Sequence, residues 1–179
     1  MSRRSTGARA TTSICRWDAM GALRVVEDVI EHWRAQDVPC LPPVDEADIA
    51  AFERAHRVTL PEDMHAFYRR TNGTRVPLYA GCDQAWYDFW PLAEIVPDED
   101  HPWAMAFCDY MMLSWWYGID LTGSGGHGAG TVYVLGTIGR RALIVARTFG
   151  EFLKCYVDGD QRLIPTYAEE YHARLLSLG

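Results

Sequence analysis

A glycine-rich run at residues 123–128 has the spacing of a nucleotide-binding motif. Its letters, Gly-Ser-Gly-Gly-His-Gly, match GxGxxG. In dinucleotide-binding proteins this motif follows a strand and opens a helix, because the pyrophosphate lies at the helix N-terminus. Here a strand-like segment follows the run, so we interpret it as a flexible hairpin loop with a solvated His127 at its tip. We therefore expect no bound cofactor.

The histidines and cysteines show no spacing typical of a metal centre or an activated nucleophile. The six histidines form no HExxH motif. His56 and His65 flank one predicted helix link, where a surface or core-edge role is typical. No GxSxG elbow occurs, and Cys82 and Cys108 have the aromatic surroundings of small core residues. We predict neither a metal site nor an enzyme, although a catalytic site assembled by the fold around Cys82, Cys108 or His127 stays open.

An acidic and aromatic run occupies residues 94–103. Acidic side chains surround Pro97, and a tryptophan ends the run. One interpretation is a solvated loop whose charge maintains solubility. The other is a lip that docks a basic partner, with charge setting the encounter rate and the tryptophan acting as an anchor. The second interpretation nominates as partner-binding residues Glu94, Asp98, Glu99, Asp100 and Trp103.

The neighbouring tryptophans Trp115 and Trp116 are the other candidate partner-binding residues. Successive side chains of a strand point to opposite faces, so these two cannot both enter one core. One of them must meet a second layer, an edge or a partner. Asp109, which precedes them among apolar residues, would need hydrogen-bond partners if buried. We expect it to cap a turn.

The charge distribution favours a basic partner over nucleic acid. The net charge is -7, and the first sixteen residues carry four arginines and no acid. That leaves 13 basic and 24 acidic residues in the remainder of the chain. A chain with this excess of acidic residues repels the phosphate backbone of nucleic acids. An acidic surface that only maintains solubility is the alternative.

The cysteine pattern and the apolar runs favour a cytoplasmic protein. The five cysteines are scattered without a CxxC pair, which is typical of reduced thiols. No apolar run approaches the roughly 18 residues of a membrane helix, and no apolar region follows the N-terminal arginines. We expect a disordered tail over residues 1–13, a helix and proline-rich connector over 14–43, and one domain over 44–179.

The hydrophobic periodicity predicts an α+β fold with helices packed on a mainly antiparallel sheet. Apolar residues recur every three or four positions from Asp18 to Trp33, and Asp45 and Pro61 open two short helices, the second ending at Asn72-Gly73. Strands follow, and a Thr148 capping box then opens another helix. The predicted strands are 86–92, 107–113, 115–121, 131–135 and 141–146, with a hairpin turn at 136–139 and a last helix at 167–178.

Several of these segments together resemble the SUKH superfamily, whose best-known members are the Smi–Knr cell-wall regulators. The opening Val44–Gly73 carries Leu-Pro-x-Asp at 60–63, an aromatic-rich helix, and Asn-Gly at 72–73. Further matches are Phe-Trp-Pro-Leu at 89–92, Asp109-Tyr110 ahead of Tyr-Gly-Ile-Asp at 117–120, and the helix start at 148–153. The resemblance covers Val44 to Tyr156.

The resemblance implies an α+β domain without a shared catalytic motif. Many bacterial members are immunity proteins that neutralise a cognate toxin, often a nuclease, whereas eukaryotic members regulate wall synthesis. We therefore expect a protein that binds a basic toxin domain, and the alternative is a regulatory scaffold without a toxin partner. Immunity surfaces vary between members, so the resemblance assigns no binding residue.

Overall fold

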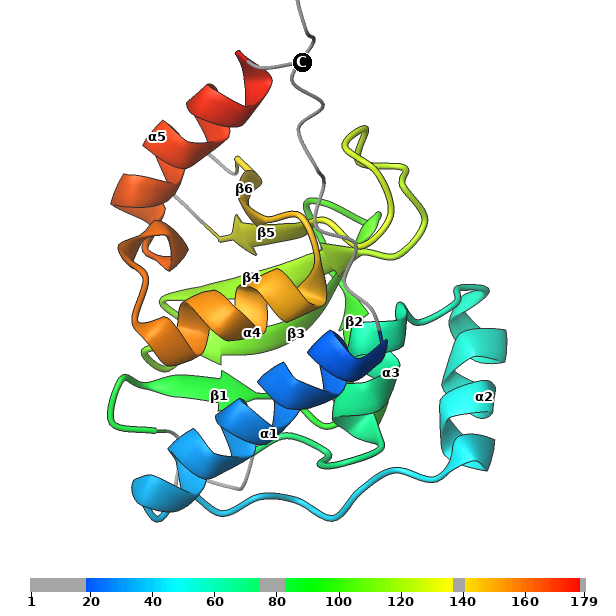
Figure 1. The fold of residues 1–179 in the computed structure, drawn as a ribbon. Coiled ribbons are helices and arrows are strands. Elements are labelled where there is room, and N and C mark those ends of the chain that lie inside the picture. Colours follow the sequence, from blue (N-terminus) through cyan, green and yellow to red (C-terminus); the bar gives the residue numbers. More distant parts are fainter. Residues whose placement is uncertain (1–18, 75–82, 137–140, 178–179) are drawn as a thin grey trace, which may run out of the picture.

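The described residues form five helices and a six-stranded antiparallel sheet, which confirms the predicted α+β fold class (Figure 1). The computed structural model describes residues 19–74, 83–136 and 141–177. The predicted tail at 1–13 and most of the predicted turn at 136–139 lie outside these ranges, as do Cys15 and Cys82. The helices are α1 (Ala19–Ala35), α2 (Glu46–His56), α3 (Glu62–Tyr68), α4 (Phe149–Asp158) and α5 (Pro165–Leu176), with short 3-10 turns η2 (Leu92–Glu94) and η3 (Gln161–Leu163).

The sheet is a meander with one additional edge strand. Its order is β1-β3-β4-β5-β6, and β2 also pairs with β3, so that β1 and β2 share one edge. Every pairing is antiparallel. The strands are β1 (Tyr87–Phe89), β2 (Val96–Pro97), β3 (Ala104–Tyr110), β4 (Trp115–Asp120), β5 (Val132–Leu135) and β6 (Leu143–Ala146).

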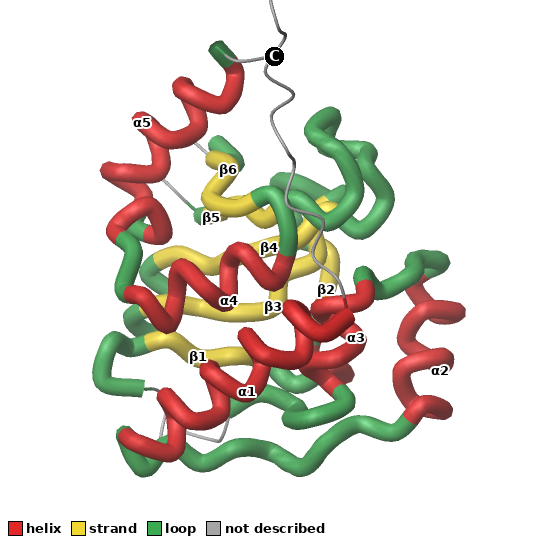
Figure 2. The backbone as a smooth tube through the Cα atoms, in the orientation of Figure 1, coloured by secondary structure: helices red, strands yellow, loops and turns green. Residues whose placement is uncertain are grey.

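Helices α1, α3 and α4 cover one face of the sheet, which we call the first face (Figure 2). Its core is aromatic: Phe67 of α3 and Phe152 of α4 pack around Phe89 of β1 with ring centroids about 6 Å apart. Trp33 of α1 lies in the same core, and its indole Nε1 donates to Tyr156 Oη at 2.7 Å. The aromatic residues therefore join three helices to the sheet.

The opposite face, which we call the second face, carries a smaller apolar cluster. It consists of Ala104, Tyr133, Leu135 and Ile144. Helix α5 covers one end of it through Tyr171 and Leu175. The remainder of this face is covered by aromatic side chains and loops, which form the candidate site described below.

Two predicted helix boundaries shift in the structure. Asp45 caps α2 as predicted, since its Oδ1 accepts the Asp48 N–H at 2.9 Å. Pro61, however, is the N-cap of α3 and not its first helical residue, and α3 ends at Tyr68. The Asn72-Gly73 pair is therefore not its stop. A Cβ on Gly73 would lie 2.3 Å from the Phe89 carbonyl oxygen, so this glycine permits a close approach to β1.

Two predicted strands also have different limits. The strand predicted at 86–92 is β1, three residues long, because Trp86 has a φ of 68° and Pro91 precedes η2. The strand predicted at 107–113 is β3, which begins at Ala104 and ends at Tyr110. It ends there because Met111, Met112 and Leu113 all adopt left-handed φ angles, of 49°, 53° and 65°. The two-residue β2 was not predicted.

A buried carboxylate joins α3 to α4. Asp63 Oδ1 accepts the Met64 N–H at 2.9 Å, and Oδ2 accepts the Gly150 N–H at 2.6 Å. The carboxylate thus lies at the N-termini of both helices, where the helix dipoles favour negative charge. Burial raises the pKa of Asp63 above its ordinary value, and the two N–H groups oppose that rise.

We expect Asp63→Ala to lower the free energy of unfolding by about 3 kcal/mol, because two buried N–H groups lose their acceptor. Glu62→Ala is the matched control, since Glu62 is exposed in the same helical turn. It should change stability by less than about 1 kcal/mol. Urea unfolding of both variants measures the difference, and equal losses would contradict the assigned role of Asp63.

The turn after β3 offers a stabilising substitution. Met112 is 56% exposed and has a φ of 53°, so its side chain contributes little burial while its backbone is strained. Met112→Gly should raise stability by about 1 kcal/mol, because glycine adopts left-handed angles without a steric penalty. Met112→Ala keeps the strain and should give no gain. A melting temperature lower for the glycine variant than for the alanine variant would refute this.

Candidate functional site: an acidic and aromatic face of the sheet

The acidic and aromatic run forms a lip, residues 94–103, along one edge of the sheet. It leaves η2, pairs through β2 with β3, and reverses at residues 98–101 to enter β3. The reversal is closed by the Asp98 N–H, which donates to Ala104 O at 2.9 Å, and by the Ala104 N–H, which donates to His101 O at 2.8 Å. Pro97 suits this position, because an edge strand tolerates the missing N–H.

Asp98 holds the lip against the second face. Its side chain is buried, and Oδ2 accepts the Trp116 Nε1–H at 2.8 Å. Oδ1 accepts the His101 backbone N–H at 2.8 Å and lies 2.9 Å from His101 Nδ1. Asp98 therefore positions other groups of the site and does not present its carboxylate to solvent. The three remaining acidic residues of the lip, Glu94, Glu99 and Asp100, are exposed.

The two neighbouring tryptophans lie on opposite faces, as strand geometry predicts. Trp116 is half-buried on the second face and packs against its cluster. Trp115 lies on the first face, where it stacks on Tyr110 with ring centroids 4.5 Å apart and donates to Tyr117 Oη at 3.1 Å. Trp115 is thus separated by the sheet from the other candidate residues.

Trp103 joins Trp116 on the second face. Its ring meets Tyr133 edge-on at 4.7 Å between centroids, and it packs against the same cluster. A Cβ on Gly125 would lie 2.7 Å from this ring, so the glycine-rich loop rests directly on Trp103. The structure therefore brings together the lip and two of the three nominated tryptophans.

Trp90 is a residue of this face that was not nominated from the sequence. Its Nε1–H donates to Asp109 Oδ2 at 3.0 Å, and the Leu113 N–H donates to Asp109 Oδ1 at 3.3 Å. Asp109 is opposite Trp116 in the β3–β4 register, which places it on the second face. The expected turn-capping role of Asp109 is thus confirmed. Trp90 comes two residues after Asp88 in the segment predicted as a strand, and residues two apart in a strand point to the same face. This spacing was the sequence signal that could have nominated Trp90.

The glycine-rich run is a loop between the antiparallel strands β4 and β5, which confirms the predicted hairpin connection, while its predicted flexibility stays a prediction. Asp120 anchors it: Oδ1 accepts the Gly123 N–H and Oδ2 accepts the Gly125 N–H, both at 2.7 Å. A strand and not a helix follows the loop, so it has no nucleotide-binding helix N-terminus. His127 is exposed at the loop, in agreement with the prediction.

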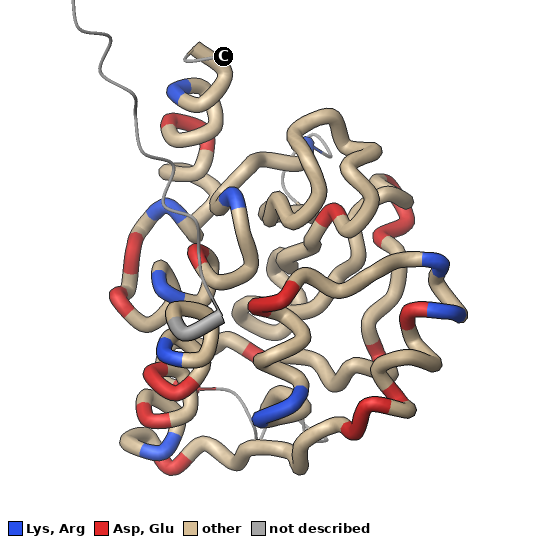
Figure 3. The backbone as a smooth tube through the Cα atoms, turned by 45° about the vertical axis from the view of Figure 1, so that its right-hand side comes forward, with Lys and Arg blue, Asp and Glu red and all other residues tan. Residues whose placement is uncertain are grey.

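The middle of the chain carries negative charge alone. From Val76 to Gly139 the sequence contains eight acidic residues and neither lysine nor arginine. No described strand contains a basic residue, and the basic positions of Figure 3 fall on helices and connecting segments. Five of the eight acids are buried. They are Asp83, Asp88, Asp98, Asp109 and Asp120.

The described residues offer no support for covalent catalysis. Cys108 is fully buried, and burial, together with the neighbouring Asp109 carboxylate, raises the pKa of its thiol well above the ordinary value. A low pKa and partial exposure are what a reactive thiol requires. Within the described ranges no three metal-ligating side chains gather. His56 packs on Phe52, and His65 pairs with Glu46.

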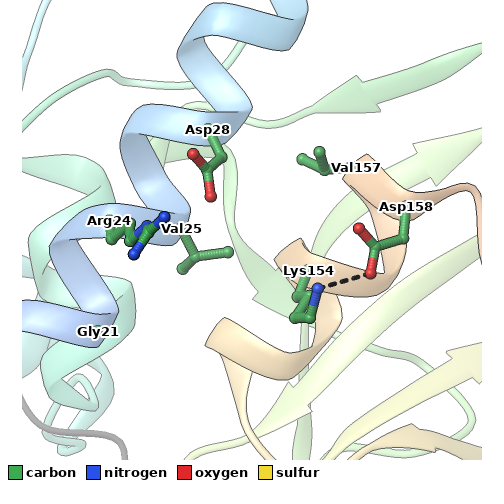
Figure 4. A pocket seen from close by; sticks show the side chains of 7 residues that line it. All are labelled: Gly21, Arg24, Val25, Asp28, Lys154, Val157 and Asp158. Carbon is green, nitrogen blue, oxygen red and sulfur yellow. Dashed lines mark hydrogen bonds and ion pairs between the residues drawn. The ribbon is translucent and has the colours of Figure 1, made fainter.

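A hollow of about 320 Å³ lies between α1 and α4 on the first-face side (Figure 4). On its α4 wall the Lys154 ammonium pairs with Asp158, one helical turn further on, at 2.7 Å (Figure 4). Its lining contains no thiol, hydroxyl or imidazole, and its ionisable groups are two carboxylates, one ammonium and one guanidinium. The lining residues are Gly21, Arg24, Val25, Asp28, Lys154, Val157 and Asp158.

We expect Asp98→Asn to destabilise the protein by about 1–2 kcal/mol, because one amide cannot accept both from Trp116 and from His101. Glu99→Gln, one residue along and exposed, is the control and should be neutral within about 0.5 kcal/mol. Thermal unfolding compares the two. If Asp98→Asn unfolded at the wild-type temperature, the role of Asp98 in holding the lip would be wrong.

One comparison with known proteins, a family match, supports this architecture. A search of curated proteins finds no match. None of the helices in the described ranges has the length and apolar character that crossing a bilayer requires. The family described as SMI1 / KNR4 family (SUKH-1) matches residues 43–155, a span that runs from the connector before α2 into α4 and includes Asp63, Asp109 and the lip. Because that match covers well over half of the sequence, the chain belongs to the SMI1/KNR4 family of the SUKH superfamily.

Proposed function

We propose that this protein is a non-catalytic immunity protein that neutralises a toxin domain by binding it through the lip and the second face. Membership of the SUKH family supports this proposal, because the family contains many immunity proteins. The buried thiol, the absence of a metal cluster among the described residues and the anchored glycine-rich loop are consistent with a binding protein.

The observation that carries the proposal is the combination of exposed acids with fixed, half-buried tryptophans. Glu94, Glu99 and Asp100 are exposed on the lip, Trp103 ends the lip, and Trp116 packs beside Trp103 on the second face. Tryptophan is the residue most enriched among those that dominate binding energy. Acidic clusters accelerate the approach of a basic partner and disfavour acidic ones.

A basic partner fits this face on physical grounds. A toxin that cleaves nucleic acid needs a positive surface to hold phosphates. An acidic face that covers this surface neutralises its charge and blocks access of the substrate. The mechanism requires a one-to-one complex and no chemical step. We place this complex in the cytoplasm, where the free cysteines Cys40, Cys108 and Cys155 stay reduced.

Co-expression with a toxin-like domain encoded by a neighbouring gene tests the proposal. We expect restored growth and a stoichiometric complex on purification. Neither protection nor co-purification would reject the immunity function. Recovery of native cellular proteins in an organism without a linked toxin would favour a regulatory scaffold instead.

Charge reversal on the lip should slow association with the toxin. We expect the double variant Glu99→Lys, Asp100→Lys to reduce the association rate at low salt about tenfold or more. Its control is Asp28→Lys, Glu31→Lys, an exposed acidic pair on α1 at the first face. Surface plasmon resonance across a salt series measures both. The difference should shrink as salt rises, and equal effects of the two pairs would place the interface elsewhere.

A further inference from the structure

Two hollows lie along α2 and meet at His56, and we call them together the α2 groove. The first has a volume of about 640 Å³ and lies between α2, the connector and η2. The second, of about 430 Å³, lies between the end of α2 and the lip. His56 lines both, so the groove continues from the connector to the face proposed above as the interface.

The groove is lined mainly by apolar side chains. In the first hollow these include Pro42, Pro43, Ala51, Phe52, Ala55 and Leu92. In the second they include Val58, Pro97, Pro102, Trp103, Met105 and Leu121. Hollows of these volumes with a mainly apolar lining have the form of sites that receive the side chains of a bound molecule.

The charges around the groove are mainly acidic, although Arg54 and Arg57 line an adjoining hollow that shares Val58, Leu121 and Thr122 with the second one. Among the described residues that line the two hollows there is no lysine or arginine, whereas Asp48 lines the first. Glu94 follows Ala93 of the first hollow, and Glu99 and Asp100 lie between Pro97 and Pro102 of the second. The groove therefore favours an apolar segment with cationic groups beside it, and disfavours an acidic one.

Helix α2 stands away from the rest of the molecule (Figure 1). Of its eleven residues only Ile49 and Phe52 are buried. Ala47, Ala51 and Ala55 are exposed on successive turns, and the last two line the groove. Small side chains there leave the groove open along the helix.

We propose that the α2 groove receives an extended, apolar segment of the toxin partner that is flanked by lysine or arginine. This inference rests on the proposed function and adds to it the chemistry of the bound segment. Eleven helical residues span about 16 Å, which corresponds to about five residues in extended conformation. The apolar side chains of the bound toxin segment enter the two hollows, and the cationic groups of that segment face Asp48 and the lip.

Ala51→Trp tests the proposal, because the indole fills the first hollow from an exposed helical position. We expect it to weaken the complex with the toxin domain at least about tenfold, with its largest effect on the dissociation rate. Ala47→Trp, one turn away on the same helix and outside the lining, is the matched control and should change affinity less than about threefold. Ala55→Arg should weaken binding more than Ala47→Arg, because it places a cation beside the cationic segment.

The outcomes separate the groove from the function. If the wild-type protein formed no complex, the proposed function would fail and this inference with it. If a complex formed and Ala51→Trp bound as tightly as Ala47→Trp, the groove alone would be wrong. Circular dichroism and the melting temperature check that the variants fold. If Ala51→Trp does not fold, the affinity of Ala55→Arg compared with that of Ala47→Arg tests the groove instead.

Measurements on the free protein identify other occupants of the groove. A dimer that Ala51→Trp dissociates, seen by light scattering, would assign the groove to a second copy. Faster tryptic cleavage at Arg3, Arg4, Arg9 and Arg16 in Ala51→Trp than in Ala47→Trp would assign it to the chain's own N-terminal segment. Either result would overturn the proposal.

Discussion

The carboxylate of Asp63 joins the N-termini of two helices that are 87 residues apart in the sequence, and the arrangement of the sheet's two faces depends on this link. A buried carboxylate is unfavourable unless hydrogen bonds and dipoles compensate for lost solvation. Asp63 receives two N–H groups at the positive ends of α3 and α4. This fixes both helices over the first face, where the aromatic core forms. Among the described helices only α5 packs against the second-face cluster.

The second face is organised by buried aspartates in a similar way. Asp98 accepts from the Trp116 indole, Asp109 accepts from the Trp90 indole, and Asp120 holds the loop that rests on Trp103. Each tryptophan is thereby fixed in position before any partner arrives. A preorganised aromatic surface loses little side-chain entropy on binding, which favours affinity. The same aspartates contribute to a stretch of chain that contains no lysine or arginine.

Local patterns in the sequence were sufficient for most of the helices and for the sheet's antiparallel character. Asp45 and Thr148 cap α2 and α4 as predicted, because a cap depends on residues three positions apart. The predicted limits of β3 were wrong, because nothing in the side chains of Met111, Met112 and Leu113 indicates that all three adopt left-handed backbone angles. Strand alternation correctly placed Trp115 and Trp116 on opposite faces.

The sequence could nominate the lip but could not distinguish its exposed acids from its buried one. Asp98 is buried because Trp116, 18 residues later, donates a hydrogen bond to it, and that contact exists only once β2, β3 and β4 have assembled. The α2 groove was not predicted for the same reason. Its two hollows combine the connector, α2, the lip and the start of the glycine-rich loop, which the fold brings together from distant parts of the chain.

The central claim is that the lip and the second face contact a basic toxin partner. Hydrogen–deuterium exchange of the free protein and of its complex with a toxin domain encoded by a neighbouring gene tests this claim most directly. Complex formation should slow amide exchange in residues 94–103 and in α2, and leave the exposed turns of α1 and α4 unchanged. Slower exchange confined to α1 and α4, with residues 94–103 exchanging as in the free protein, would contradict the account.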